Sequence, residues 1–596
     1  MTDIAMTIPD LHAAYARGVS PEQIIAQVYT RLREVDDPCI FLSMASEADA
    51  QAAAAALGPY DPAKPLWGVP FAVKDNIDVA GYETTAACPA YAYTPTQDAF
   101  VVAKLHEAGA IFIGKTNLDQ FATGLVGVRT PYGAPRNSID PEIVPGGSSG
   151  GSGVAVGHGI VAFSLGTDTA GSGRVPAALN NIIGLKPTLG ALSATGVVPA
   201  CRSVETVSIF ALTVADAYTA FTVACAYDAA DAYARHISAP PLAAPKSAPV
   251  IGIPSRDSIR FSGDAVQEAS FNAAVDLLRG QGAEIREIDF TPLYDVADML
   301  YEGAWVAERY TVIEDLLHKD PKAILPVTRQ VICKAEALSA ADAFRGMYRL
   351  KELSRIAETA LEGLDMLCVP TIPTFHTVAE LEADPIGPNS NFGTYTNFVN
   401  LLDMCGIAVP VPARSDGRPG SVTLLAAAGK DADIAASGLA LEAAEKRNLG
   451  ATGWPFNGTP TLEAAATDGL ILAVCGAHMH GLPLNHQLTQ RGATYHGAAK
   501  TTDSYRFYAL AGDPPARPGL VKGTPGSGAS IAVELWSLPF EKVGGFLEAI
   551  PAPLGIGTVD LSDGRQVKGF ICEAEAVAES TDITQIGDWR NYLAQL

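Results

Sequence analysis

Hydrophobic runs alternate with amphipathic stretches along the first three quarters of the chain. Short apolar runs bounded by turn residues predict buried strands, and apolar positions at helical spacing predict helices between them. The predicted strands cover 66–73, 110–114, 249–253, 283–289 and 365–370, and the predicted helices cover 46–57, 97–108 and 264–280. This alternation favours an α/β fold with a mostly parallel mixed sheet covered by helices.

The pattern changes after a stretch rich in proline and glycine, residues 449–462. Beyond it, short strands outnumber helices. The strands are predicted over 469–475 and 504–510, with a hairpin over 558–572 that turns at Asp563-Gly564. We therefore expect two domains, residues 1–455 and a smaller β-rich C-terminal domain over 465–596.

Composition and charge narrow the class of protein. Of 596 residues, 48% are hydrophobic and 18% are charged, which indicates a folded core, and the net charge is −24. Because nucleic acids and anionic membranes would be repelled, neither is expected as a partner. The N-terminal sequence MTDIAMTIPD does not resemble a signal peptide, and no apolar run reaches membrane-spanning length, so we expect a cytoplasmic protein.

The metal-binding residue types are scattered. The nine cysteines form no CxxC pair, and the four histidines between residues 478 and 496 lack cysteines or carboxylates at ligand spacing. We therefore expect neither a metal nor any other cofactor.

The segment 145–188 combines many glycines and serines with apolar stretches. The apolar stretches argue against a flexible linker, and the segment lacks the GxxxxGK[ST] of a phosphate-binding loop. Residues 146–150 match the GxSxG elbow of α/β-hydrolases, but the required histidine would have to be His318 or His376, and neither has a supporting context.

Several motifs of this segment, together with an earlier one, match a different family of enzymes. The motifs GGSSGGS, GTDTAGSGRVPA and GLKPT, with GVPFAVKD over 68–75, resemble the amidase signature family. The resemblance implies Ser172 as the nucleophile, Ser148 in a cis peptide as its neighbour and Lys74 as the base. The interval from Ser148 to Ser172 agrees with the family pattern, whereas Ala170 stands where many members have glycine.

The chemistry that this set requires can be stated independently. A serine needs an adjacent base, and lysine is a base only when neutral, so its pKa must fall from about 10.4 by about three units. Burial beside the apolar VPFAV run before Lys74 favours such a shift. The oxyanion formed by attack on an amide needs donors, for which we expect the backbone N–H groups of Thr169, Ala170, Gly171 and Ser172.

Two further segments resemble one branch of the family, the allophanate hydrolases. These are KTNLDQFATGLVGVRTPYG over 115–133 and YEGAWVAERY over 301–310. The resemblance implies that a small anionic substrate contacts the backbone of Gly124 and the side chains of Tyr301 and Arg309. Arginine suits a carboxylate because it offers a planar, bidentate partner, and on one helix the two side chains would lie about 80° apart.

Residues 469–512 resemble the C-terminal domain of the same enzymes, which is similar to a γ-glutamyl cyclotransferase-type barrel. In those enzymes the amidase half releases ammonia, and the C-terminal half has been linked to decarboxylation of the remaining N-carboxycarbamate. His486, in the loop PLNHQL, is our candidate for proton transfer because imidazole titrates near neutral pH. A structural role for this histidine stays open.

The predicted function is therefore hydrolysis of allophanate to ammonia and carbon dioxide or bicarbonate. The alternatives are a general small-amide amidase and an amidotransferase-type subunit that passes ammonia to a tRNA-bound partner. The net charge and the β-rich C-terminal domain argue against the amidotransferase. We also expect a homodimer and a functional link to a urea carboxylase. The sequence has no MKM biotin-attachment motif, so the carboxylase is expected on another chain.

Overall fold

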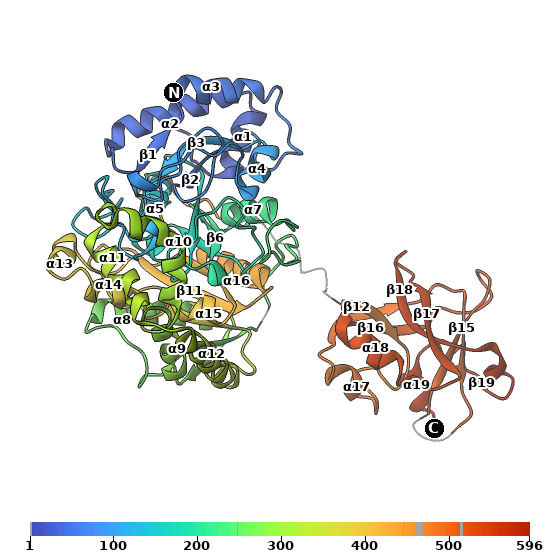
Figure 1. The fold of residues 1–596 in the computed structure, drawn as a ribbon. Coiled ribbons are helices and arrows are strands. Elements are labelled where there is room, and N and C mark those ends of the chain that lie inside the picture. Colours follow the sequence, from blue (N-terminus) through green and yellow to red (C-terminus); the bar gives the residue numbers. More distant parts are fainter. Residues whose placement is uncertain (1–2, 247, 445, 459–468, 513–515) are drawn as a thin grey trace. The chain divides into compact units, whose positions relative to one another are not determined.

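The chain forms two compact units, residues 1–463 and 464–596, in a computed structural model (Figure 1). The structure describes residues 3–596 except 247, 445, 459–468 and 513–515. Each unit has its own hydrophobic core.

An eleven-stranded sheet runs through the first unit. Its strands, in spatial order, are β1 (Phe41–Met44), β3 (Ile111–Thr116), β2 (Pro70–Lys74), β4 (Phe163–Asp168), β6 (Thr206–Ala211), β5 (Ile183–Lys186), β10 (Met404–Val411), β11 (Gly420–Ala427), β9 (Met366–Pro370), β7 (Val250–Pro254) and β8 (Glu284–Ile288). Strand β2 is parallel to β3 and β4, and β7 is parallel to β8 and β9. The prediction of an α/β fold with a mixed sheet is confirmed.

The predominance of parallel pairing is not observed. From β4 through β6, β5, β10 and β11 to β9, every neighbouring pair is antiparallel. The alternation of strands and helices misses this because β10 and β11 follow each other without a helix between them and form a hairpin. Parallel neighbours need a crossover, so the helical connections predict correctly only the pairs of β2 with β3 and β4 and of β7 with β8 and β9, and the edge strand β1 is antiparallel to β3.

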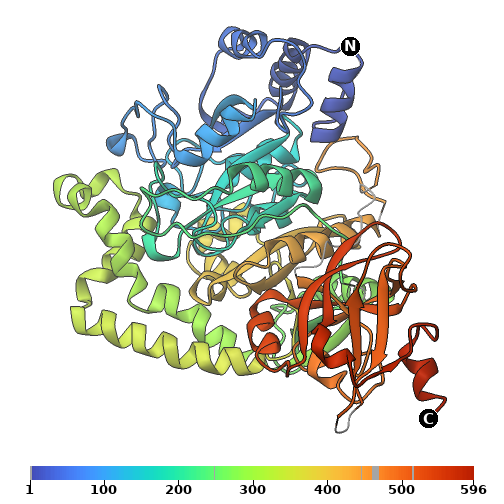
Figure 2. The ribbon, with the colours of Figure 1, turned by 90° about the vertical axis from the view of Figure 1, so that its right-hand side faces the viewer.

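Helices cover both faces of this sheet (Figures 1 and 2). They are α1 (Ile8–Ala16), α2 (Pro21–Val35), α3 (Glu47–Ala56), α4 (Phe100–Glu107), α5 (Gly150–Gly157), α6 (Val175–Leu179), α7 (Val214–Ala224), α8 (Ala265–Gly280), α9 (Thr291–Glu302), α10 (Trp305–Lys319), α11 (Pro326–Ile332), α12 (Ala340–Ala360), α13 (Val378–Ala383), α14 (Gly387–Phe392), α15 (Phe398–Leu401) and α16 (Asp431–Ala443). The predicted helix starts are confirmed at α3, where the Ser46 hydroxyl accepts from the Asp49 N–H at 3.1 Å, and at α8, which Asp264 caps.

The second unit contains two smaller sheets. The five-stranded sheet has the order β13 (Thr494–Lys500), β16 (Ala532–Pro539), β12 (Gly469–Val474), β18 (Gln566–Cys572) and β17 (Leu554–Asp560), and the three-stranded sheet has β15 (Pro518–Lys522), β14 (Tyr505–Ala509) and β19 (Thr581–Asp582). Three helices, α17 (His486–Thr489), α18 (Phe540–Leu547) and α19 (Trp589–Leu593), accompany them. The predicted hairpin is confirmed: β17 pairs with β18, and Gly564 provides the positive φ of the turn.

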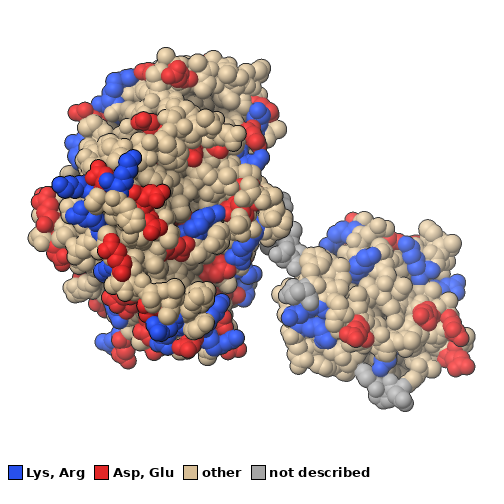
Figure 3. All heavy atoms as spheres, in the orientation of Figure 1, with Lys and Arg blue, Asp and Glu red and all other residues tan. Residues whose placement is uncertain are grey.

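Charge is distributed without a dominant patch on the face visible in Figure 3, where acidic and basic side chains are interspersed over each unit. Among the helices of the described residues, none combines the length and hydrophobicity that a bilayer span requires.

Candidate active site

Lys74 lies at the carboxyl end of β2, inside the large sheet, and its side chain is fully buried. Its Nζ atom donates to Ser148 Oγ at 2.7 Å and to Thr167 Oγ1 at 2.8 Å. Burial lowers the pKa of Lys74 to about 8, although nearby carboxylates, Glu205 first among them, oppose the shift. The fall is smaller than the sequence argument requires, but it leaves a substantial neutral fraction near pH 7.5.

Ser148 directly precedes the turn into α5, and the peptide bond between Gly147 and Ser148 is cis, as the resemblance implies. The Asp119 N–H donates to the Ser148 carbonyl at 2.9 Å. The Asp119 carboxylate in turn accepts from the N–H groups of Val126 at 3.2 Å and Gly127 at 3.0 Å. A side chain on Gly147 would overlap that carboxylate, so only glycine fits there.

Ser172 lies in the loop between β4 and α6, and Asp168 organises this loop. The Asp168 carboxylate accepts from Gly171 N–H at 2.8 Å and Gly173 N–H at 3.0 Å, and Arg174 binds both of its oxygens at 2.9 Å. Burial alone would raise the pKa of Asp168, but Arg174, Lys186 and the Gly173 N–H together outweigh it, and that pKa is lowered. The loop is therefore fixed by an ionised carboxylate before any substrate binds.

The hydroxyl of Ser172 is free. Its residue is only 3% exposed, yet its Oγ forms no hydrogen bond with the described residues, so the structure pairs Lys74 with Ser148 but does not join Ser148 to Ser172. Thr167 links the two halves of the set, because it binds Lys74 and lies on the strand that leads into the Ser172 loop. Sequence reasoning missed Thr167, although the signal was present in the GTDTAGSG motif.

The backbone donors around Ser172 differ in availability. Gly171 was expected to donate to the oxyanion, but its N–H already donates to Asp168. The N–H groups of Thr169 and Ala170 have no acceptor among the described residues and are available. Gly171 instead has a conformational role: its φ is +128°, and a Cβ there would lie 2.5 Å from Thr396 Oγ1.

Tyr301 and Arg309, which were expected to contact the carboxylate of the substrate, form a second cluster, the proposed acid-binding cluster. Arg309 Nη2 donates to the Tyr301 hydroxyl at 3.2 Å, and the guanidinium lies 4.9 Å from the centre of the Tyr301 ring. The eight-residue spacing suggested that the two residues share one helix, but they do not. Tyr301 lies on α9, which ends before Gly303, and Arg309 lies on α10. Gly303 interrupts the helix because its backbone is extended, and the two side chains still meet across the break.

Gly124 lies beside this cluster. Arg309 Nη1 donates to the hydroxyl of the preceding residue, Thr123, at 3.2 Å. A Cβ on Gly124 would lie 2.5 Å from Asp119 Oδ2 and 3.1 Å from Arg129 Cδ. The absence of a side chain therefore lets this loop approach Asp119 closely, which links the acid-binding cluster to the Ser148 turn.

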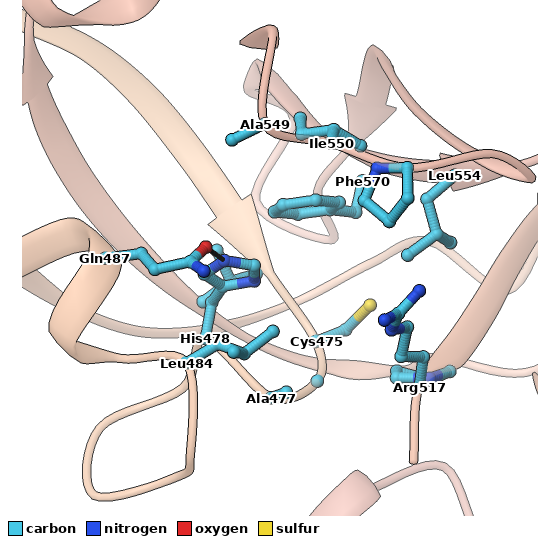
Figure 4. Close-up of a pocket in the computed structure, with 14 residues that line it drawn as sticks. Cys475, Ala477, His478, Leu484, Gln487, Arg517, Ala549, Ile550, Leu554 and Phe570 are labelled. Atoms are coloured by element: carbon cyan, nitrogen blue, oxygen red, sulfur yellow. Dashed lines mark hydrogen bonds between the residues drawn. The ribbon is translucent and has the colours of Figure 1, made fainter. Parts of the chain in front are cut away.

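The second unit contains a cavity of about 150 Å³ (Figure 4). Among its lining side chains are His478, Arg517, Gln487 and Cys475. His478 Nε2 donates to Gln487 Oε1 at 3.0 Å, and its ring stacks on Phe570 at a centroid distance of 5.0 Å. Burial lowers the pKa of His478 and raises that of the Cys475 thiol to about 12.

His486 does not line this cavity. It begins α17, its side chain is exposed, and its Nδ1 lies 2.9 Å from the Pro483 carbonyl oxygen. The histidine on the cavity wall is His478, which follows the buried strand β12. The position after a buried strand is the signal in the sequence that could have selected His478 over its neighbours.

The fold, together with a buried lysine–serine pair and a glycine-rich serine loop, defines an amidase-type hydrolase. The Amidase family model matches residues 23–434, and the model of the allophanate hydrolase C-terminal domain matches residues 470–594. The chain therefore belongs to the amidase family.

Individual relatives agree with this assignment. The urea amidolyase of Saccharomyces cerevisiae is 46% identical over 553 residues, which are 89% of this chain and 30% of that protein. The structure of Kluyveromyces lactis allophanate hydrolase is 40% identical, with a TM-score of 0.82 and full coverage of both chains. A glutamyl-tRNA(Gln) amidotransferase subunit from Carboxydothermus hydrogenoformans is 35% identical over 66% of this chain and 88% of its own. The chain thus spans about 30% of the length of the urea amidolyases that it matches.

Proposed function

We propose that the chain hydrolyses allophanate, with Ser172 as nucleophile, Ser148 as proton relay and Lys74 as base. The observation that carries this proposal is the fully buried Lys74 amine, 2.7 Å from Ser148 Oγ, at the base of the Ser172 loop. A neutral amine in this position can accept a proton through Ser148 when Ser172 attacks. The similarity to Kluyveromyces lactis allophanate hydrolase over the whole chain supports this choice of substrate.

The proposed reaction at this site has two half-reactions. Ser172 Oγ attacks the terminal amide carbon, its proton moves through Ser148 to Lys74, and the N–H groups of Thr169 and Ala170 bind the oxyanion. The tetrahedral intermediate collapses when Lys74 returns the proton to the leaving nitrogen, which departs as ammonia. Water then attacks the acyl-enzyme with the same base, and N-carboxycarbamate is released.

The acid-binding cluster explains the preference for an anionic amide. Arg309 is 1% exposed, already oriented by Tyr301, and has no carboxylate partner among the described residues. A buried guanidinium without an ion pair favours binding of a carboxylate, which allophanate carries next to its amide. Gly124 contributes its backbone at the same place.

For the second unit we propose decarboxylation of N-carboxycarbamate in the cavity that contains His478 and Arg517. Arg517 would hold a carboxylate, and His478, in place of the predicted His486, would deliver a proton to the nitrogen as the C–N bond to the other carboxylate breaks. Carbon dioxide and carbamate result, and carbamate then yields a second ammonia and a second carbon dioxide. The partly buried position of His478 and its hydrogen bond to Gln487 support this choice.

Allophanate is the carboxylation product of urea, so we propose a functional link to an enzyme that carboxylates urea. The similarity to urea amidolyases, of which the chain spans about 30%, supports the link. The homodimer, the cytoplasmic location and the absence of a cofactor stay predictions.

The test is ammonia release by the purified chain from allophanate, compared with biuret and with glutamine. We expect allophanate to be preferred, and Ser172→Ala to abolish the release. A preference for neutral amides would favour the general amidase. Glutamine-dependent release that needs a partner would favour the amidotransferase, since the chain is also similar to a component of such an enzyme.

A further inference from the structure

Arg129 belongs to the VGVRTPYG part of the segment that resembles the allophanate hydrolases, yet the reaction described above does not use it. Its backbone is fixed on both sides: its N–H donates to Asp119 Oδ1 at 2.8 Å, and its carbonyl accepts from the Gln120 N–H at 2.7 Å. The residue is 4% exposed. Asp119 therefore joins the backbone of Arg129 to the Ser148 turn, which it also contacts.

The side chain of Arg129 converges with Arg309 on one residue. Arg129 Nη1 donates to the Thr123 carbonyl at 3.0 Å, and Arg309 Nη1 donates to the Thr123 hydroxyl at 3.2 Å. Arg129 Nη2 donates to the Pro385 carbonyl at 2.6 Å, which ties the Thr123–Gly124 loop to the segment before α14. Two guanidinium groups thus flank the backbone that is expected to contact the substrate.

Neither guanidinium is neutralised by an ion pair. Among the described residues, no carboxylate oxygen lies within 4.0 Å of the charged nitrogens of Arg129 or Arg309. The Nε atoms of both residues are buried without a hydrogen-bond partner. The nearby Asp119 carboxylate offsets part of the effect of burial on the pKa of Arg129, but it contacts three backbone N–H groups and not the guanidinium. Two buried cations without paired anions are costly unless a ligand supplies the negative charge.

We propose that Arg129 is a second, specificity-determining cation of the acid-binding cluster, which positions Thr123 against Arg309 and favours amides that carry a carboxylate. This inference rests on the proposed hydrolysis of allophanate. It assigns Arg129 a positioning and electrostatic role in substrate capture and no role in proton transfer, so its effect falls on KM and leaves kcat nearly unchanged.

The experiment compares two variants of the full chain. Arg129→Lys retains the positive charge but loses the planar guanidinium with its several N–H donors. Arg129→Gln retains an N–H donor but loses the charge. We expect Arg129→Gln to raise the KM for allophanate about tenfold or more, and Arg129→Lys to raise it by about threefold or less, with kcat in both within about threefold of wild type. The inhibition constant of biuret, the neutral isostere, should change little in either variant.

Arg414→Gln is the matched control, because Arg414 is also buried in the first unit but is paired with Asp264 and Asp416. It should lower the melting temperature and leave the KM unchanged. Equal rises in KM for the two Arg129 variants, unchanged KM in Arg129→Gln, or a parallel loss of biuret binding would overturn the proposal. A wild-type chain that releases no ammonia from allophanate would instead overturn the proposed function, and this inference with it.

Discussion

The proposed base is surrounded by hydroxyl groups. Lys74 Nζ donates to Ser148 and Thr167, and its charge is not balanced by a contacting carboxylate among the described residues. Because burial dominates its environment, its pKa falls to about 8. A lysine in this state exchanges a proton near neutral pH, which is the property that a serine nucleophile requires of its base.

The first prediction concerns pH. Protonated Lys74 cannot accept a proton, so kcat/KM should rise about tenfold per pH unit on the acid side and level off above pH 8. A pH–rate profile of ammonia release between pH 6 and 9 measures this. A profile that is flat across this range would show that Lys74 does not act as the base.

The second prediction concerns the two serines. Ser172→Ala should lower kcat by about 10⁴-fold or more, and adding Ser148→Ala should lower it little further, because residues that act as a unit are not additive. Single-turnover ammonia release measures both, and an unchanged melting temperature serves as the folding control. Independent, multiplicative losses would argue against the relay.

At this scale the sequence alone predicts the lysine and both serines, because their motifs surround them at family spacing. It does not predict Arg129, because the role of this residue depends on partners distant in the sequence, and it missed Thr167 and His478 although their local sequence carried a signal. Arg129 bonds to Pro385, and His478 forms its stacking contact with Phe570. Such contacts leave no local pattern.

Among the elements, the loop between β4 and α6 is held by an internal ion pair and two backbone hydrogen bonds. Asp168 holds the N–H groups of Gly171 and Gly173 and pairs with Arg174, so the backbone around Ser172 has little freedom. In the proposed reaction, this arrangement would keep the N–H groups of Thr169 and Ala170 in place for the oxyanion, without rearrangement.

The third prediction tests this loop. Gly171→Ala should lower both kcat and stability, by more than about 1 kcal/mol for the latter, because alanine disfavours a φ of +128° and its Cβ would contact Thr396. Gly429→Ala is the control, since Gly429 has a φ of +83° but open space around it. Denaturant unfolding measures the stability of each variant, and ammonia release measures its kcat. Equal losses of stability and kcat in Gly171→Ala and Gly429→Ala would exclude the contact with Thr396 as a cause.

Helix starts were predicted well where a capping residue is present. Helix breaks and the pairing of strands were predicted less well. Ser46 and Asp264 mark their helices, and both starts are confirmed. The break at Gly303 and the antiparallel centre of the sheet were missed, because a single extended glycine and the pairing of strands such as β10 and β11 are decided by tertiary packing.

For the whole molecule, the proposal assigns a chemically different site to each of the two units. The first has the proposed nucleophile and base and a cluster with two buried arginines, and the second has a histidine and an arginine on the wall of a small cavity. Composition and the change in pattern near residue 449 predict that the C-terminal part is rich in strands, but they do not reveal the cavity, because its walls come from separate segments.

The fourth prediction separates the sites. His478→Gln should leave the release of the first ammonia within about twofold of wild type and slow the release of carbon dioxide by about tenfold or more, because only proton delivery in the second unit is impaired. Simultaneous ammonia and carbon dioxide assays measure both. Ser172→Ala is the reference, since it should stop both products, and His486→Gln should change neither.

The helix break at Gly303 has a consequence for how this catalyst diversifies. It places Tyr301 and Arg309 on two separate helices, α9 and α10, far along the chain from Lys74, Ser148 and Ser172. If the proposed function holds, substitutions in these helices or in residues 123–129 would change which amides bind and leave Lys74, Ser148 and Ser172 unchanged. Natural selection and protein engineering would therefore share two short stretches of chain, α9 to α10 and residues 123–129, in which to search for new substrates.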